Sequence, residues 1–152
     1  MTATLTPADL AAGAGTTVMQ AFADDAAPGS EAQPRPTKTI LVVDDELGPR
    51  EALRFILTPF YNVTVAKDGR EALERFVAER PDMVISDIRM PVMTGIELMK
   101  ALRWRSPETP FVLLTGYATL ASAQEAVRQG AFDYITKPYN VKDIRQLVAR
   151  AL

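Results

Sequence analysis

The sequence has 152 residues, of which 47% are hydrophobic and 24% are charged, with a formal net charge of −2. These values are typical of one ordinary globular domain and give no sign of the clustered basic surface that binds nucleic acid. The absence of cysteine and histidine excludes disulfides, thiolate metal sites and any imidazole acting as base, ligand or phosphate carrier.

Residues 1–38 differ in composition from the rest of the chain. They are rich in Ala, Thr, Gly and Pro, and they end in PGSEAQPRPTK, which is typical of a linker. We expect a flexible N-terminal extension. The alternative is a short docking helix that begins near Thr6 and has Val18, Met19 and Phe22 on one face. The N-terminus lacks the basic start and the continuous apolar core of a signal peptide. We therefore expect a cytoplasmic protein without membrane insertion.

From Thr39 onward, apolar runs alternate with helical patterns. The expected strands are 39–45, 61–66, 82–87, 111–115 and 132–136, and the expected helices are 49–57, 69–79, 95–105, 120–129 and 141–152. Such an α/β alternation with short connections favours one parallel sheet that has helices on both faces. The second domain of the chain is therefore expected at residues 39–152.

Polar residues follow most of the expected strands. Asp44 and Asp45 end the first strand, Asp87 ends the third, Thr115 ends the fourth, and Lys137 follows the fifth. Because the carboxyl ends of parallel strands meet at one edge of a sheet, where ligands bind in such folds, we expect these side chains to converge.

Three converging carboxylates repel one another unless a cation joins them. The donor set contains only oxygen, which selects Mg²⁺, or Mn²⁺, over zinc and copper. A carboxylate beside such an ion can attack phosphorus and form an aspartyl phosphate. Lys137 would supply a positive charge for the phosphoryl oxygens, and Thr115 would donate a hydrogen bond to the same group.

Four segments appear in order along the chain: VVDDE, SDIRMPVMTG, LLTGYA and GAFDYITKP. Together they resemble the receiver domain of bacterial two-component response regulators. Their sequences are most similar to those of the nitrogen-regulatory, NtrC-like class. The resemblance covers residues 39–152. It implies a doubly wound, flavodoxin-like (βα)5 fold with strand order 2-1-3-4-5.

The resemblance also implies the role of each site residue. Asp87 is the expected phosphoacceptor. The expected magnesium ligands are Asp45, Asp44, Asp87 and the backbone carbonyl of Arg89.

Other implied roles concern the phosphoryl group and the response to it. Thr115 and Lys137 are expected to contact the phosphoryl group. Tyr134 is expected to change rotamer when Thr115 moves. The bond before Pro138 is expected to be cis, which aims the lysine inward.

The resemblance implies a signalling switch that takes a phosphoryl group from a sensor histidine kinase or a histidine phosphotransfer protein. A homodimer through residues 120–129, 132–136 and 141–152 is a further expectation. The sequence leaves open a constitutive docking module without phosphate chemistry, and also a stand-alone receiver or a part of a longer regulator. A small aspartate-nucleophile phosphatase is disfavoured, because Arg89 stands where those enzymes have a second acid.

Simpler readings of single motifs stay open at this stage. Asp44 and Asp45 could cap the following helix, and Asp87 could form an Asx turn. Thr115 could belong to an ordinary turn, and Tyr134 could serve packing alone.

Overall fold

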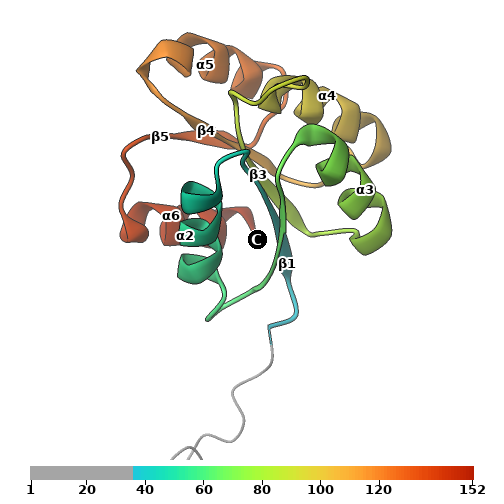
Figure 1. Ribbon diagram of the computed structural model, residues 1–152, viewed down its shortest axis with the longest axis vertical. Coiled ribbons are helices and arrows are strands. Elements are labelled where there is room, and N and C mark those ends of the chain that lie inside the picture. The colour runs from blue at the N-terminus through green and yellow to red at the C-terminus, as the bar shows by residue number, and fades with distance from the viewer. Residues whose placement is uncertain (1–35) are drawn as a thin grey trace, which may run out of the picture. The chain divides into compact units, whose positions relative to one another are not determined.

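The computed structural model describes residues 36–152, which form alternating strands and helices (Figure 1). The strands are β1 (Thr39–Val43), β2 (Asn62–Ala66), β3 (Met83–Asp87), β4 (Phe111–Thr115) and β5 (Asp133–Thr136). The helices are α2 (Leu47–Leu57), α3 (Gly69–Glu79), α4 (Gly95–Arg105), α5 (Leu120–Arg128) and α6 (Val141–Ala151), with a 3-10 turn η2 (Tyr117–Thr119).

The five strands form one parallel sheet in the order β2-β1-β3-β4-β5, as the sequence predicts. Helices α2 and α6 lie on one face, and α3, α4 and α5 lie on the other (Figure 1). Each face has its own apolar core. Strands β3 and β4 are buried along their whole length, because helices cover them on both sides.

Side-chain caps fix the starts of α3, α4 and α6. Thr94 accepts a hydrogen bond from the Glu97 N–H, and the Glu97 carboxylate accepts one from the Thr94 N–H. Asp68 and Asn140 cap α3 and α6 in the same way with one bond each. Such caps satisfy backbone donors that a helix start leaves unpaired. The caps thereby fix the residues at which the loops before α3, α4 and α6 end and the helices begin.

Several element boundaries differ from the expected ones. Strand β1 ends at Val43 rather than at Asp45, because the Asp44 N–H makes the last ladder bond, to the Ala66 carbonyl, before the chain turns. Helix α2 begins at Leu47 rather than at Pro49, since a proline in the first turn removes no intrahelical bond. The turn η2 was not predicted.

Some expected core positions are exposed. The helical spacing of Ala72, Leu73, Phe76 and Val77 predicts that they share one buried side of α3, but Val77 is 55% exposed. Ala72 and Phe76 already define the line that faces the sheet, and Val77 is rotated by about 100° from Phe76. Ala52 on α2 is exposed for the same reason.

Residues 1–35 of the expected N-terminal extension, including the alternative docking helix, lie outside the described residues. The domain boundary at residue 38 stays a prediction. Among residues 36–152, no helix is both long and apolar enough to cross a membrane.

Helix α5 is anchored more lightly than its neighbours. Its buried residues are Ala123 and Ala126, whereas α4 buries Leu98, Met99 and Leu102. A buried leucine or methionine contributes about 1.5–3 kcal/mol, and a buried alanine contributes much less. Among the helices on this face, α5 therefore has the smallest apolar contribution to its docking.

We predict that α5 opens locally more often than α4. Amide hydrogen exchange of the intact protein should show protection at Ala123–Val127 lower than at Leu98–Leu102, by about tenfold or more. The two helices share one face of the sheet, so α4 is an internal control. Equal protection in both helices would contradict the prediction.

Candidate functional site

Three carboxylates meet at the carboxyl edge of the sheet. Asp44 and Asp45 follow β1, and Asp87 ends the neighbouring strand β3, where Val43 pairs with Ser86. One oxygen from each carboxylate lies within 4.8 Å of the others. Asp44 is fully buried and Asp87 is 8% exposed, whereas Asp45 is exposed. Parallel pairing of β1 with β3 thus produces the predicted acidic cluster.

The Lys137 ammonium lies against this cluster. Its Nζ is 3.3 Å from Asp87 Oδ1 and 4.0 Å from Asp44 Oδ2. The Lys137 N–H donates to the Thr115 carbonyl at 2.8 Å, and the Lys137–Pro138 peptide bond is cis. A single ammonium offsets one of three negative charges, so the cluster retains an excess of negative charge.

The Asp44 carboxylate is fully buried but only one of its two oxygens accepts a hydrogen bond from the described residues. Its Oδ1 accepts the Glu46 N–H at 2.9 Å, but its buried Oδ2 has no hydrogen-bond partner among the described residues. Burial raises the pKa of Asp44 above its ordinary value, and the negative charges of Asp87 and Asp45 add to the rise. The Glu46 N–H and the Lys137 charge act in the opposite direction.

This orphaned oxygen, in a set made only of carboxylates, fits a hard divalent cation. Buried oxygen acceptors normally find a partner, and an unpaired one beside two further carboxylates has the chemistry of a magnesium or manganese ligand. Asp44, Asp45 and Asp87 therefore fit the predicted metal. Arg89 lies two residues beyond Asp87 in the β3–α4 loop, with an exposed side chain.

Thr115 ends β4 and is fully buried. Its hydroxyl donates to the Gly116 carbonyl at 3.0 Å and shares a 2.6 Å hydrogen bond with the Thr119 hydroxyl. Among the described residues it makes no hydrogen bond with Asp87. The sequence analysis did not single out Thr119. Its position four residues after Thr115, in an unpredicted turn, was the only available signal.

Two tyrosines flank the site. Tyr134 on β5 is half-buried and packs on the core that contains Ala123 and Ala126 of α5. The Gln124 amide donates to its hydroxyl at 3.4 Å. Tyr139 was missed by the sequence analysis, although it directly follows the Lys-Pro pair. Burial raises the pKa of Tyr139, and the charges of Asp44 and Asp87 raise it further.

The loop after Asp87 has two constrained positions. The Gly95 N–H donates to the Ile88 carbonyl at 2.9 Å, and a side chain on Gly95 would overlap the Asp87 carbonyl oxygen. Val92 has φ of 71°, and the Met93 N–H donates to the Pro91 carbonyl at 2.7 Å across it. A β-branched residue in such a tight turn is strained.

Comparison with known proteins identifies the family. Residues 40–149 match the family described as the response regulator receiver domain. The chain belongs to this family. The predicted resemblance and the predicted fold are therefore both confirmed, and the chain is a signal-transduction module of two-component systems.

Two curated relatives are of the expected class. The regulatory protein AtoC of Escherichia coli K12 is 44% identical over 115 residues, which are 74% of this chain and 25% of AtoC. The DNA-binding transcriptional regulator NtrC of the same strain is 38% identical over 114 residues, 74% of this chain and 24% of NtrC. The chain thus spans about a quarter of the length of these relatives.

Solved structures agree with the sequence relatives. The receiver domain of NtrX from Brucella abortus superposes with a TM-score of 0.72 at 32% identity, covering 74% of this chain and 97% of that one. Chemotaxis protein CheY4 of Vibrio cholerae gives a TM-score of 0.71 at 37% identity, with coverages of 76% and 98%.

We predict that Asp44→Asn stabilises the metal-free protein and abolishes its response to magnesium. When a chelator has removed divalent metal ions, loss of the buried charge should raise the free energy of unfolding by about 1 kcal/mol. Urea denaturation measures this change. Excess Mg²⁺ should then stabilise the wild type but not the variant. Glu74→Gln removes an exposed carboxylate from α3 and serves as the control.

The pH dependence of this difference has a definite sign. Because the pKa of Asp44 is raised above 3.8, the native state holds this proton more tightly than the unfolded state. The metal-free wild type should therefore lose stability relative to Asp44→Asn as pH rises from 3.8 through the raised pKa. A difference that shrinks with rising pH would contradict the assignment.

Proposed function

We propose that this chain is a phosphoacceptor switch in which Asp87 takes a phosphoryl group from phosphohistidine. The donor would be a sensor histidine kinase or a histidine phosphotransfer protein in the cytoplasm. One observation carries the proposal: the Asp87 carboxylate is 8% exposed, with the Lys137 ammonium 3.3 Å from Oδ1 and two further carboxylates beside it. The chain would catalyse only its own phosphorylation and dephosphorylation.

The contacts of Asp87 suggest which oxygen reacts. Oδ1 accepts the Ile88 N–H at 3.0 Å and faces Lys137, whereas no hydrogen bond or ion pair engages Oδ2 among residues 36–152. We therefore assign the attack on phosphorus to Oδ2. A new P–O bond forms while the P–N bond of phosphohistidine breaks, and the bonding pair leaves with the imidazole nitrogen. Lys137 then offsets negative charge on the phosphoryl oxygens.

Asp44, Asp45, Asp87 and the Arg89 carbonyl would hold Mg²⁺, with Mn²⁺ as a substitute. When bound, the ion would neutralise the carboxylates and the oxygens of the incoming phosphoryl group. Asp44 would contribute its buried Oδ2, which accepts no hydrogen bond from the described residues. The Glu46 N–H would keep this carboxylate oriented through Oδ1.

The response to phosphorylation would begin at Thr115. Its hydroxyl bonds to Thr119 and Gly116, so a phosphoryl group on Asp87 would compete with these partners for it. Tyr134 would then turn inward next to α5, whose docking depends on two alanines. A preference of a few kcal/mol for the phosphorylated arrangement is enough to shift such an equilibrium.

The surface of α5, β5 and α6 would carry the output, as a docking face or a homodimer contact. Two of its arginines form ion pairs with acidic residues of the same surface. Arg128 pairs with Glu125 at 2.7 Å, and Arg150 pairs with Asp133 at 2.9 Å. Exposed pairs of this kind contribute little, so exchanging them for contacts with a partner would cost little.

Two other functions fit this fold less well. A constitutive docking module would not need a buried Asp44 carboxylate with one oxygen that accepts no hydrogen bond from the described residues. A phosphatase would need a second acid where Arg89 stands. Multiple turnover on simple phosphate esters would favour the phosphatase.

We predict that acetyl phosphate with Mg²⁺ adds one phosphoryl group to the protein. Asp87→Asn should abolish the addition, and Lys137→Ala should slow it strongly because Asp87 loses its neighbouring positive charge. Intact-mass spectrometry measures the gain. Asp133→Asn, which removes a carboxylate paired with Arg150, should react like the wild type. A gain that persists in Asp87→Asn would refute the assignment.

We further predict a phosphoryl group that persists for minutes or longer. Arg89 and Tyr117 are both exposed and bulky. In the receiver family their positions tune hydrolysis of the acyl phosphate, so we expect both side chains to hinder water at Asp87. Tyr117→Ala should shorten the half-life by about threefold or more, as followed by mass spectrometry after donor removal. Trp104→Ala, another exposed aromatic residue, is the control. A wild-type half-life of seconds would contradict the prediction.

A further inference from the structure

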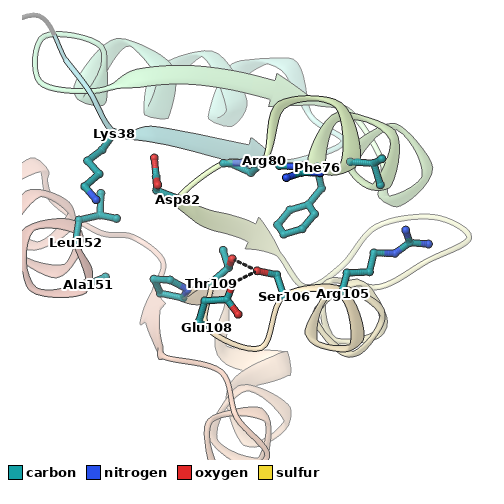
Figure 2. A pocket seen from close by; sticks show the side chains of 13 residues that line it. Lys38, Phe76, Arg80, Asp82, Arg105, Ser106, Glu108, Thr109, Ala151 and Leu152 are labelled. Atoms are coloured by element: carbon teal, nitrogen blue, oxygen red, sulfur yellow. Dashed lines mark hydrogen bonds between the residues drawn. The ribbon is translucent and has the colours of Figure 1, made fainter.

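A hollow of about 700 Å³ lies at the edge of the sheet where the strands begin (Figure 2). The last turns of α3, α4 and α6 and the segments before β1, β3 and β4 surround it. Asp87 lies at the opposite end of β3, so the proposed phosphorylation site does not use this hollow. Its volume is within the range of small-molecule sites, about 300–1,000 Å³.

The hollow has an apolar wall. The Phe76 ring points into it, toward Ser106 and Thr109 (Figure 2). Phe76 itself is 6% exposed, and the neighbouring Val77 is 55% exposed at the rim. Two prolines, Pro81 and Pro110, add further apolar surface. An apolar or aromatic body could therefore lie against Val77 and the small accessible part of the Phe76 ring.

The acidic residues of the hollow are already engaged. Asp82 Oδ2 accepts the Thr39 N–H at 2.8 Å. Glu108 accepts the Ser106 hydroxyl at 2.7 Å (Figure 2). The Ser106 bond also lowers the pKa of Glu108, so this carboxylate stays ionised and hydrogen-bonded. A hydrogen bond does not remove the charge of a carboxylate, so the side chains that line the hollow carry three positive and two negative charges.

Three basic residues line the same hollow: Lys38, Arg80 and Arg105. All three are exposed, and none forms an ion pair with an acidic residue within the part of the chain that the structure describes. Their donors are therefore available to an anion, and an arginine suits carboxylate or phosphate in particular.

The backbone conformation of Arg80 bears on whether this residue serves only to end helix α3. Basic residues at helix C-termini favourably offset the helix dipole, which would explain Arg80 and Arg105 without any ligand. However, Arg80 has φ of 48°, a left-handed conformation at a helix end that favours glycine. Glycine would fit this backbone better, so the helix end alone does not account for an arginine at position 80, which lies at the rim of the hollow.

We propose that this hollow binds a small organic anion with an aromatic or apolar body. The body would pack on Phe76, and the carboxylate, phosphate or sulfonate group would pair with Arg80 and Arg105. This proposal stands independently of the proposed phosphorylation of Asp87.

Two probes with similar aromatic bodies test the charge requirement on the full chain. The anionic probe is 8-anilino-1-naphthalenesulfonate, and N-phenyl-1-naphthylamine is its neutral counterpart. We expect one site per chain for the anion, at least about fivefold weaker binding of the neutral probe, and salt sensitivity for the anion alone. Fluorescence titration measures both affinities, and calorimetry gives the stoichiometry. Equal affinities, or several equivalent sites, would overturn the proposal.

Variants locate the site. Arg80→Gly should weaken binding of the anionic probe at least about fivefold without lowering the unfolding midpoint, because glycine suits the backbone there. Arg105→Ala and Val77→Glu should weaken it similarly. Arg128→Ala, an exposed arginine on α5, should bind like the wild type. Unchanged affinity in Arg80→Gly and Arg105→Ala would sink the assignment to this hollow.

Competition separates a small molecule from a polypeptide partner. Naphthoate should displace the anionic probe at lower molar concentration than an acidic glutamate-rich peptide does. Displacement by the peptide at lower concentration would assign the hollow to a protein partner and overturn the small-molecule proposal.

Discussion

Repulsion among three carboxylates is the constraint around which this domain is built. The pairing of β1 with β3 forces Asp44, Asp45 and Asp87 together, and burial denies Asp44 the water that would otherwise screen its charge. One lysine offsets only part of that charge. The apolar cores on both faces of the sheet must therefore hold this edge together against its own electrostatics.

The same arrangement links stability to signalling. Repulsion among the carboxylates destabilises the folded state, so binding of a cation at this site raises the stability of the folded protein. On the α5 side, the sheet is covered by a helix whose buried residues are alanines, so the cost of rearranging it is low. The contrast lies in what each helix buries: α5 buries two alanines, whereas α2 and α6 on the other face bury leucine, isoleucine and valine side chains.

The sequence was most informative where chemistry and strand ends coincide. Asp44, Asp87, Thr115 and Lys137 could be grouped because parallel strands end at one edge. The hydroxyl pair of Thr115 with Thr119 could not be predicted, since it depends on a 3-10 turn with no periodic signal. The exposure of Val77 likewise depends on the exact rotation of α3 on the sheet, which the spacing of its apolar residues does not resolve.

The tight turn at Val92 has a consequence for the backbone of the loop that follows Asp87. The side chain is fully exposed and its backbone is in a conformation that glycine tolerates best. Replacement by glycine would relieve the backbone at this position without any change in the packed interior. The loop that follows Asp87 therefore holds a local strain that the rest of the fold does not require.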